Sequence, residues 1–234
     1  IRDAEVAVQK QHPEFSIRKL DYDDPDTYKM LGQGDTEGVF QLESSGMKQV
    51  LVGLQPQNLE DVIALISLYR PGPMDSIPTY LRNRHEPDKI SYKTPQLAHI
   101  LDVTNGCIVY QEQVMQIFRE LAGFSFGQAD NVRRAMSKKK HAVMEAEREH
   151  FVHGCTEPGH ECPGCVANGI SEKVANEIYD EMSSFASYAF NKSHAACYAY
   201  VAFQTAYLKC HYPSEFMAAL LTSVLDNTDK VIEY

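Results

Sequence analysis

A cluster of cations near the middle of the sequence is the first feature that could do chemistry. Residues 133–140 read Arg-Arg-Ala-Met-Ser-Lys-Lys-Lys, so five cations fall within eight residues. A guanidinium group binds phosphate oxygens through two parallel hydrogen bonds, whereas a lysine acts as a mobile point charge. Two arginines followed by three lysines therefore suit a polyphosphate beside a nucleic-acid backbone. The alternative is a solvated helix end, since the helix dipole favours cations near a C-terminus.

A second group of polar residues opens the most apolar predicted helix. Residues 190–196 read Phe-Asn-Lys-Ser-His-Ala-Ala. Free N–H groups at a helix N-terminus attract anions, and Lys192, Ser193 and His194 would surround an anion bound there. The alternative is an ordinary N-cap followed by an alanine-rich packed helix, in which His194 has a structural role. The residues alone leave both interpretations open.

A third group combines cysteine and histidine in a turn-rich segment. Cys155, His160, Cys162 and Cys165 lie within eleven residues that also contain prolines and glycines. Three thiolates and an imidazole are a suitable ligand set for tetrahedral zinc. Four protein ligands leave no open coordination position, so this zinc would be structural and would hold the loop 153–168. The alternative is a reduced, exposed loop without a metal.

Arg70 lies next to a rigid turn, Pro-Gly-Pro at residues 71–73. Such a turn can hold a cation toward DNA with little loss of entropy. The alternative is that Arg70 ends its helix favourably and that the turn is only a corner of the fold. The sequence does not distinguish these two roles.

Hydrophobic periodicity indicates the elements that must position these residues. Apolar residues at helical spacing predict helices near residues 26–31, 59–69 and 114–121, and then over 127–139, 141–152, 171–184, 193–210 and 214–225. Ser171 and Ser214 are expected as N-caps, and Gly123 as a helix stop. No alternation of strands and turns and no dinucleotide-binding glycine motif is found. The predicted fold class is mainly α.

Composition limits the class of protein. Of the 234 residues, 44% are hydrophobic and 23% are charged, which excludes disordered and low-complexity classes. The net charge of −10 argues against bulk electrostatic coating of nucleic acid but is compatible with a local basic patch. No secretory or membrane-spanning segment is evident, so we expect a cytoplasmic protein without a membrane partner. Because the chain begins with Ile1, we also expect a piece of a larger protein.

Six motifs occur in an order that is specific to one family. They are Gly-Val-Phe-Gln-Leu-Glu-Ser-Ser-Gly-Met at 38–47, Tyr-Arg-Pro-Gly-Pro-Met at 69–74, Tyr-Gln-Glu-Gln-Val-Met at 110–115, the cationic segment at 133–140, Phe-Asn-Lys-Ser-His-Ala-Ala at 190–196, and His-Tyr-Pro-Ser-Glu-Phe-Met-Ala-Ala at 211–219. Together they closely resemble the alpha subunit of bacterial DNA polymerase III, the C-family of replicative polymerases, and specifically its fingers region. The resemblance covers nearly the whole chain.

The resemblance implies a domain organisation. A multi-helical fingers domain would occupy residues 38–225, with a small zinc-knuckle-like insertion in the Cys/His loop. Residues 1–37 would connect it to the palm, and residues 226–234 would begin the next segment. In this family the aspartates that hold Mg²⁺ belong to the palm, which would lie upstream of Ile1. We therefore expect no catalytic residue in this chain, and no activity of the chain alone.

The resemblance also implies roles for individual residues. Arg133 and Arg134 would contact the triphosphate of the incoming deoxynucleotide (dNTP). Lys192, Ser193 and His194 would line the same pocket. The run Lys138, Lys139 and Lys140 would lie near the triphosphate or the DNA backbone, and Arg70 is a further candidate for DNA contact. The expected partners are dNTP, primer-template DNA, the rest of the polymerase chain and replisome subunits, at the bacterial nucleoid.

A different class of function competes with the polymerase hypothesis. The chain could be a non-catalytic helical module that carries a structural zinc and whose cationic helix binds a nucleic acid or an acidic protein. Replacing Arg134 distinguishes the two, because only a polymerase would show a changed dependence on nucleotide. In a third interpretation, a zinc-dependent interaction domain, removing zinc would abolish partner binding.

Overall fold

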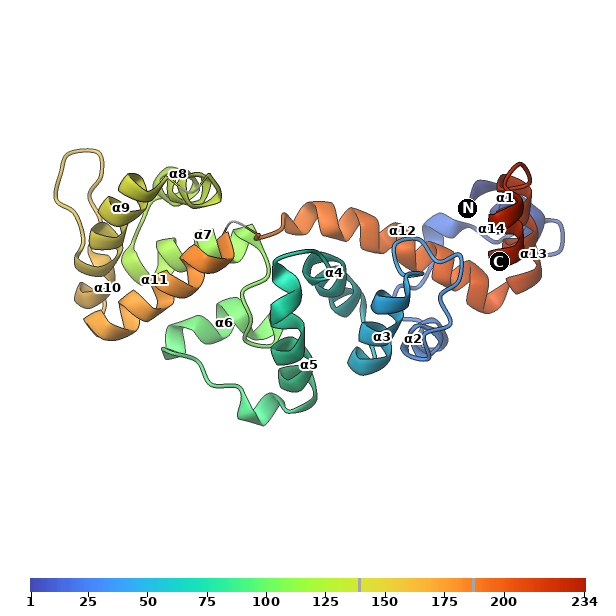
Figure 1. Cartoon of the computed structure of the whole chain (residues 1–234), viewed down its shortest axis with the longest axis horizontal. Helices are drawn as coiled ribbons and strands as arrows, with labels where there is room; N and C mark the ends of the chain where they lie inside the picture. Colours follow the sequence, from blue (N-terminus) through green and yellow to red (C-terminus); the bar gives the residue numbers. More distant parts are fainter. Residues whose placement is uncertain (139, 187) are drawn as a thin grey trace. The chain divides into compact units, whose positions relative to one another are not determined.

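The computed structural model describes residues 1–138, 140–186 and 188–234 and consists of α-helices joined by loops and short 3₁₀ turns (Figure 1). Over these residues there are no β-strands, only two isolated bridges, Tyr110 with Phe190 and Cys155 with Cys162. The mainly α fold class is confirmed. Lys139, one of the predicted DNA contacts, lies outside the described residues.

The chain forms two units. Unit 1 contains residues 1–66 and 193–234, and unit 2 contains residues 67–192. The two boundaries fall inside the 38–225 segment that the sequence analysis treats as one domain, and the domain limits at residues 37 and 225 stay a prediction. No helix in the described parts of the chain is long and apolar enough to cross a membrane.

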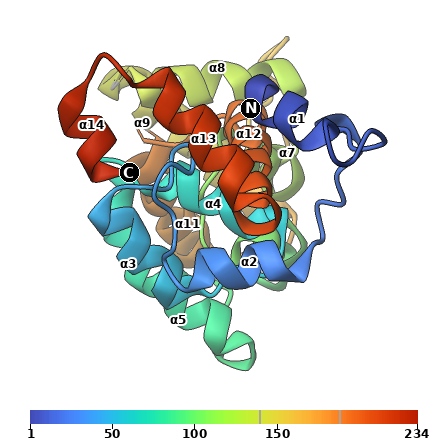
Figure 2. The same ribbon diagram turned by 90° about the vertical axis from the view of Figure 1, so that its right-hand side faces the viewer.

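Unit 1 brings the first and last segments of the chain together. Its helices are α1 (Arg2–Gln9), α2 (Pro25–Gly32), α3 (Ser45–Leu54), most of α4 (Leu59–Leu68), nearly all of α12 (Lys192–His211), α13 (Pro213–Ser223) and α14 (Thr228–Glu233). Figure 2 shows α1 beside α13. Val8 of α1, Leu208 of α12 and Phe216 of α13 share one buried cluster. Burial of these apolar side chains ties the ends of the chain to each other.

The N-terminal helix α1 is absent from the sequence prediction. Residues 1–37 are predicted as a connecting segment with one short helix near 26–31, and α2 confirms that helix. In α1 only Ala4 and Val8 are buried, so its apolar pattern is too sparse to predict a helix. Packing against α13 compensates for the weak local signal.

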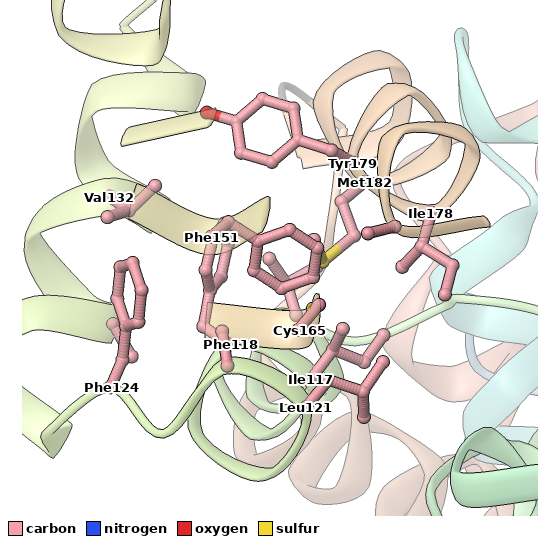
Figure 3. Packing of buried hydrophobic residues seen from close by; sticks show 14 of the residues in the cluster. Ile117, Phe118, Leu121, Phe124, Val132, Phe151, Cys165, Ile178, Tyr179 and Met182 are labelled. Atoms are coloured by element: carbon pink, nitrogen blue, oxygen red, sulfur yellow. The ribbon is translucent and has the colours of Figure 1, made fainter. Parts of the chain in front are cut away.

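Unit 2 is built around an aromatic core. Its helices are α5 (Ile77–His85), α6 (Ala98–Leu101), α7 (Gln111–Ala122), α8 (Phe126–Ser137), α9 (His141–His153), α10 (Gly164–Ala167) and α11 (Glu172–Ala186). Phe118, Phe151 and Tyr179, from three of these helices, meet with ring centroids 5.0–6.0 Å apart (Figure 3). The Tyr179 hydroxyl donates a hydrogen bond to the Met144 carbonyl at 2.6 Å, so its polar end is satisfied. These rings pack α7, α9 and α11 against one another.

The ends of α7 and α8 follow local capping rules. Gly123 ends α7 in the left-handed conformation at φ 76°, as predicted. Ser125 caps α8: its hydroxyl accepts from the Gln128 N–H at 3.3 Å, and the Gln128 amide accepts from the Ser125 N–H at 2.7 Å. These two caps turn the chain sharply from α7 into α8.

One predicted cap is wrong. Ser214 is the second residue of α13, which begins at Pro213 after Tyr212. Proline suits the first helical position because its φ is already helical and its missing N–H would have no partner there. Ser171 does cap α11, since its hydroxyl accepts from the Val174 N–H at 3.4 Å.

Candidate functional site

Arg133 is held from two sides. Its side chain, on α8, is only 18% exposed. Its Nε and Nη2 donate to Asp130 Oδ1 at 3.0 and 2.7 Å, and its Nη1 donates to Gln111 Oε1 at 2.9 Å. Asp130 lies one turn earlier on the same helix, whereas Gln111 is the first residue of α7. The orientation of the Arg133 guanidinium is therefore fixed by two helices.

Arg134 shares the same carboxylate but faces solvent. Its Nε lies 2.7 Å from Asp130 Oδ2, and its side chain is 65% exposed. The hydrogen bonds from Arg133 and the charges of both arginines hold the pKa of Asp130 below its usual value. One ionised carboxylate thus binds the guanidinium groups of both adjacent arginines.

Lys138 and Lys140 lie between two helices rather than on one. Helix α8 ends at Ser137, so the predicted end at residue 139 is too long. Lys138 is the C-cap of α8, Lys140 is the N-cap of α9, and both are exposed. Together with Arg134 they make this end of α8 strongly cationic in a chain of net charge −10.

The start of α7 links Arg133 to the segment before α12. Gln111 Nε2 donates to the Ala189 carbonyl at 2.9 Å, and the Gln111 N–H donates to the Phe190 carbonyl at 2.9 Å. From the sequence alone, residues 110–115 have no chemical role beyond their place in the family pattern. The contact between Gln111 and Ala189 spans 78 residues of sequence, so no local sequence pattern could reveal it.

At the predicted anion site at the start of α12, a carboxylate of the chain itself, Glu112, accepts a hydrogen bond. The Lys192 N–H donates to both oxygens of Glu112, at 3.1 and 3.2 Å. The Lys192 ammonium lies 5.3 Å from the centre of the Tyr110 ring, within the range of a cation–π interaction. Tyr110, Gln111 and Glu112 therefore contact residues of both predicted phosphate sites.

Ser193 and His194 follow directly in α12 and are both exposed. The His194 ring lies 4.5 Å from the ring of Tyr198, one turn further along the helix. The boundary between the units falls between Lys192 and Ser193. Of the predicted nucleotide contacts, unit 2 thus carries Arg133, Arg134 and Lys192.

Arg70 makes internal contacts. Its Nη2 donates to the Tyr188 carbonyl at 2.9 Å, its Nε donates to the Ser67 carbonyl at 3.0 Å, and its guanidinium lies 4.0 Å over the Phe190 ring. Burial lowers the pKa of Arg70. These contacts favour the corner role that the sequence left open, and DNA contact by Arg70 stays a prediction.

The loop between α9 and α10 (Figure 1) carries Cys155 and Cys162, and Cys165 follows in α10; Cys162 and Cys165 are both buried in the unit 2 core, and Cys155 packs against it. Cys155 and Cys162 exchange two backbone hydrogen bonds of 2.9 Å, which close a small hairpin. Cys165 is fully buried in the unit 2 core, where burial raises the pKa of its thiol to about 12, and it lies beside the aromatic residues in Figure 3. His160 is exposed. Within residues 1–138, 140–186 and 188–234 no three His, Cys, Asp or Glu side chains are grouped for a metal. The four predicted ligands are thus not assembled, and zinc stays a prediction.

Comparison with known proteins gives consistent relationships. The family described as "Bacterial DNA polymerase III alpha subunit finger domain" matches residues 1–159. The "DNA polymerase III subunit alpha" of Thermus aquaticus is 50% identical over 234 residues, covering 98% of this chain and 18% of the relative. The proteins of that name from Bacillus subtilis (strain 168) and Staphylococcus aureus (strain Mu50) are each 45% identical. They cover 97% and 94% of this chain, and 19% and 20% of their own lengths. The chain spans about a fifth of the length of these relatives.

Proposed function

Because the chain belongs to the finger-domain family of bacterial DNA polymerase III alpha subunits, we propose that it binds the triphosphate of an incoming dNTP and primer-template DNA. The parent enzyme would be a DNA-directed DNA polymerase of bacterial chromosome replication. Membership of the family confirms the resemblance found in the sequence.

The observation that carries the proposal is the arginine pair on α8. Arg134 is 65% exposed, and Arg133 is held on two sides by Asp130 and Gln111. A planar guanidinium matches the oxygens of a phosphate group. A cation that is already oriented loses little entropy when the anion binds, so it can stabilise charge that develops during reaction.

Phosphoryl transfer can be catalysed by groups that lie on different domains of one enzyme. The reaction depends mainly on positioning and on stabilising negative charge, with metal ions holding the attacking and leaving oxygens. We propose that this chain supplies the cationic contacts, while palm carboxylates outside it hold Mg²⁺. On that basis the isolated chain would be inactive.

The remaining predicted contacts belong to the same proposal. Lys192, Ser193 and His194 would contact the nucleotide, whereas Lys138, Lys139, Lys140 and Arg70 would contact DNA or the triphosphate. The exposure of Lys138 and Lys140 supports this role, and the internal contacts of Arg70 make it the weakest member of the group. Replisome subunits and a nucleoid location are part of the proposal for the parent enzyme.

Replacing Arg134 by alanine in the complete polymerase tests the proposal. We expect the KM for dNTP to rise, or kcat to fall, by roughly ten-fold or more, because a hydrogen-bonded charge contact to the triphosphate is lost. Primer-template affinity should change much less. Steady-state primer extension and a DNA-binding titration measure the two effects.

The matched control is Arg119→Ala, which removes an exposed arginine from the last turn of α7. Nucleotide dependence should be unchanged in this variant. An Arg134→Ala enzyme with weakened DNA binding and unchanged nucleotide dependence would contradict the proposal and favour the non-catalytic alternative.

A further inference from the structure

Gln111 makes three hydrogen bonds that join parts of unit 2 which are distant in sequence. Its side-chain oxygen accepts from Arg133 Nη1, its side-chain nitrogen donates to the Ala189 carbonyl, and its backbone N–H donates to the Phe190 carbonyl, each at 2.9 Å. Its partners come from α8 and from the segment that leads into α12. Gln111 thus ties Arg133 to the chain that precedes Lys192.

The chemistry of the partners fixes the orientation of the Gln111 amide. A carbonyl oxygen can only accept a hydrogen bond, and a guanidinium can only donate one. The amide nitrogen must therefore face Ala189, and the amide oxygen must face Arg133. Rotating the amide would place two donors together and two acceptors together. The glutamine is consequently a fixed acceptor for Arg133 at one defined position.

The acceptor matters because Gln111 binds a different nitrogen of the guanidinium from those that Asp130 binds. Asp130 binds Nε and Nη2, whereas Nη1 is bound by Gln111. Without Gln111 as an acceptor, the Nη1 end of the guanidinium would lose its hydrogen bond and its position would be less restricted. With all three nitrogens bound, its plane is set before a ligand arrives.

We propose that Gln111 is a positioning residue that orients Arg133 for the triphosphate of the incoming nucleotide. This inference rests on the proposed function of Arg133. Gln111 acts through Arg133 and needs no contact of its own with the nucleotide. The neighbouring Glu112 and Tyr110, which contact Lys192, make the start of α7 a common support for both cations.

A double-mutant cycle in the complete polymerase tests this role. The variants are Gln111→Met, which keeps the length of the side chain but removes both polar groups, Arg133→Ala, and the two together. We expect Gln111→Met to raise the KM for dNTP roughly ten-fold, because this factor corresponds to the loss of one hydrogen bond to a charged group. In the Arg133→Ala background the same change should alter KM by less than about two-fold, because the group that Gln111 orients is absent.

The matched control is Gln116→Met on the same helix, because Gln116 hydrogen-bonds to Glu120 and not to Arg133. Its KM should equal that of the unchanged enzyme. Partial misfolding would lower the amount of active enzyme and hence the apparent kcat, but it would leave KM unaffected. KM therefore reports orientation even if Gln111→Met reduces stability.

The outcomes separate the two proposals. If Arg133→Ala raises KM but Gln111→Met does not, or if their effects multiply in the double variant, the positioning role of Gln111 is overturned. If neither Arg133→Ala nor Arg134→Ala changes the nucleotide dependence, the proposed function itself fails. Loss of the Gln111 effect in the Arg133→Ala background supports the positioning role.

Discussion

At the scale of single residues, the candidate site depends on internal counterions. Asp130 lies against Arg133 and Arg134, and Glu112 accepts from the first N–H of α12. A bound triphosphate would have to share these donors with the carboxylates. Such counterions hold the cations in place before a nucleotide binds, and they also oppose anions of low charge, because a single negative charge gains little by competing with them.

A second ionic cluster, in unit 1, leads to a prediction about pH. The Glu37 carboxylate accepts a hydrogen bond from Lys48, which, with the nearby charge of Lys209, lowers its pKa from 4.5 to about 2. The folded state thus favours ionised Glu37 more than the unfolded state does. Its contribution to stability is complete above pH 4.5 and is lost as the pH falls toward 2.

Replacing Glu37 by glutamine should remove that contribution. We expect a lower melting temperature at pH 7 and a smaller further loss between pH 4.5 and pH 2 than in the unchanged chain. Thermal unfolding followed by circular dichroism across this pH range measures both. Glu157→Gln, at an exposed loop position, is the control and should leave the curve unchanged. Identical pH profiles for Glu37→Gln and the unchanged chain would contradict the expectation.

At the scale of elements, the turn after α4 has a strict steric requirement. Gly72 has φ 106°, and a Cβ at this position would lie 2.3 Å from Cδ1 of the Tyr188 ring. Alanine would therefore be strained in its backbone and would displace the ring. The Arg70 guanidinium hydrogen-bonds to the Tyr188 carbonyl, so this contact would also be disturbed.

We expect Gly72→Ala to destabilise unit 2 by about 1–3 kcal/mol, the usual range for such backbone strain. Gly127→Ala is the matched control, because Gly127 lies in α8 and its Cβ would meet no atom within 4 Å. That control should stabilise the helix by about 0.5–1 kcal/mol. Urea unfolding of each variant measures the difference, and equal stabilities for the two variants would contradict the steric argument.

The Cys/His loop is the element on which the sequence prediction has the least support. Its hairpin is closed by backbone hydrogen bonds, and Cys165 packs among apolar side chains. Metal analysis of the purified chain decides between the alternatives. One zinc ion per chain would support the predicted site, whereas a metal-free chain would leave the hairpin closed by its backbone hydrogen bonds alone.

The helices differ in how far the sequence could predict them. The ranges 141–152, 171–184 and 193–210 agree with α9, α11 and α12 to within two residues, because long apolar periodicity gives a strong local signal. The sequence pattern does not predict α1, α3 or α5, nor the short helices α6, α10 and α14. The role of Gln111 could not be predicted, since its partners Arg133 and Ala189 are placed by tertiary packing.

At the scale of the whole molecule, we expect the two units to unfold independently of each other. Val8 is 1% exposed in the unit 1 cluster, whereas Val6 on the same helix is 51% exposed. Val8→Asp would bury an unpaired carboxylate, which is strongly unfavourable. We expect amides of α13 to lose protection against hydrogen exchange while amides of α7 and α11 keep theirs. Val6→Asp should change neither, and equal loss in both units would show that they unfold together.

The order of the units along the chain has a consequence for biosynthesis. Unit 2 is continuous in sequence, whereas unit 1 needs residues 1–66 and residues 193–234. A ribosome that adds about 5–20 residues per second would complete unit 2 while the first segment still waits for its partner for on the order of ten seconds. During that interval the apolar side of α1 is uncovered, because α13 has not yet been made. Residues 1–66 are therefore open to premature association and to chaperone capture until residues 193–234 have been made.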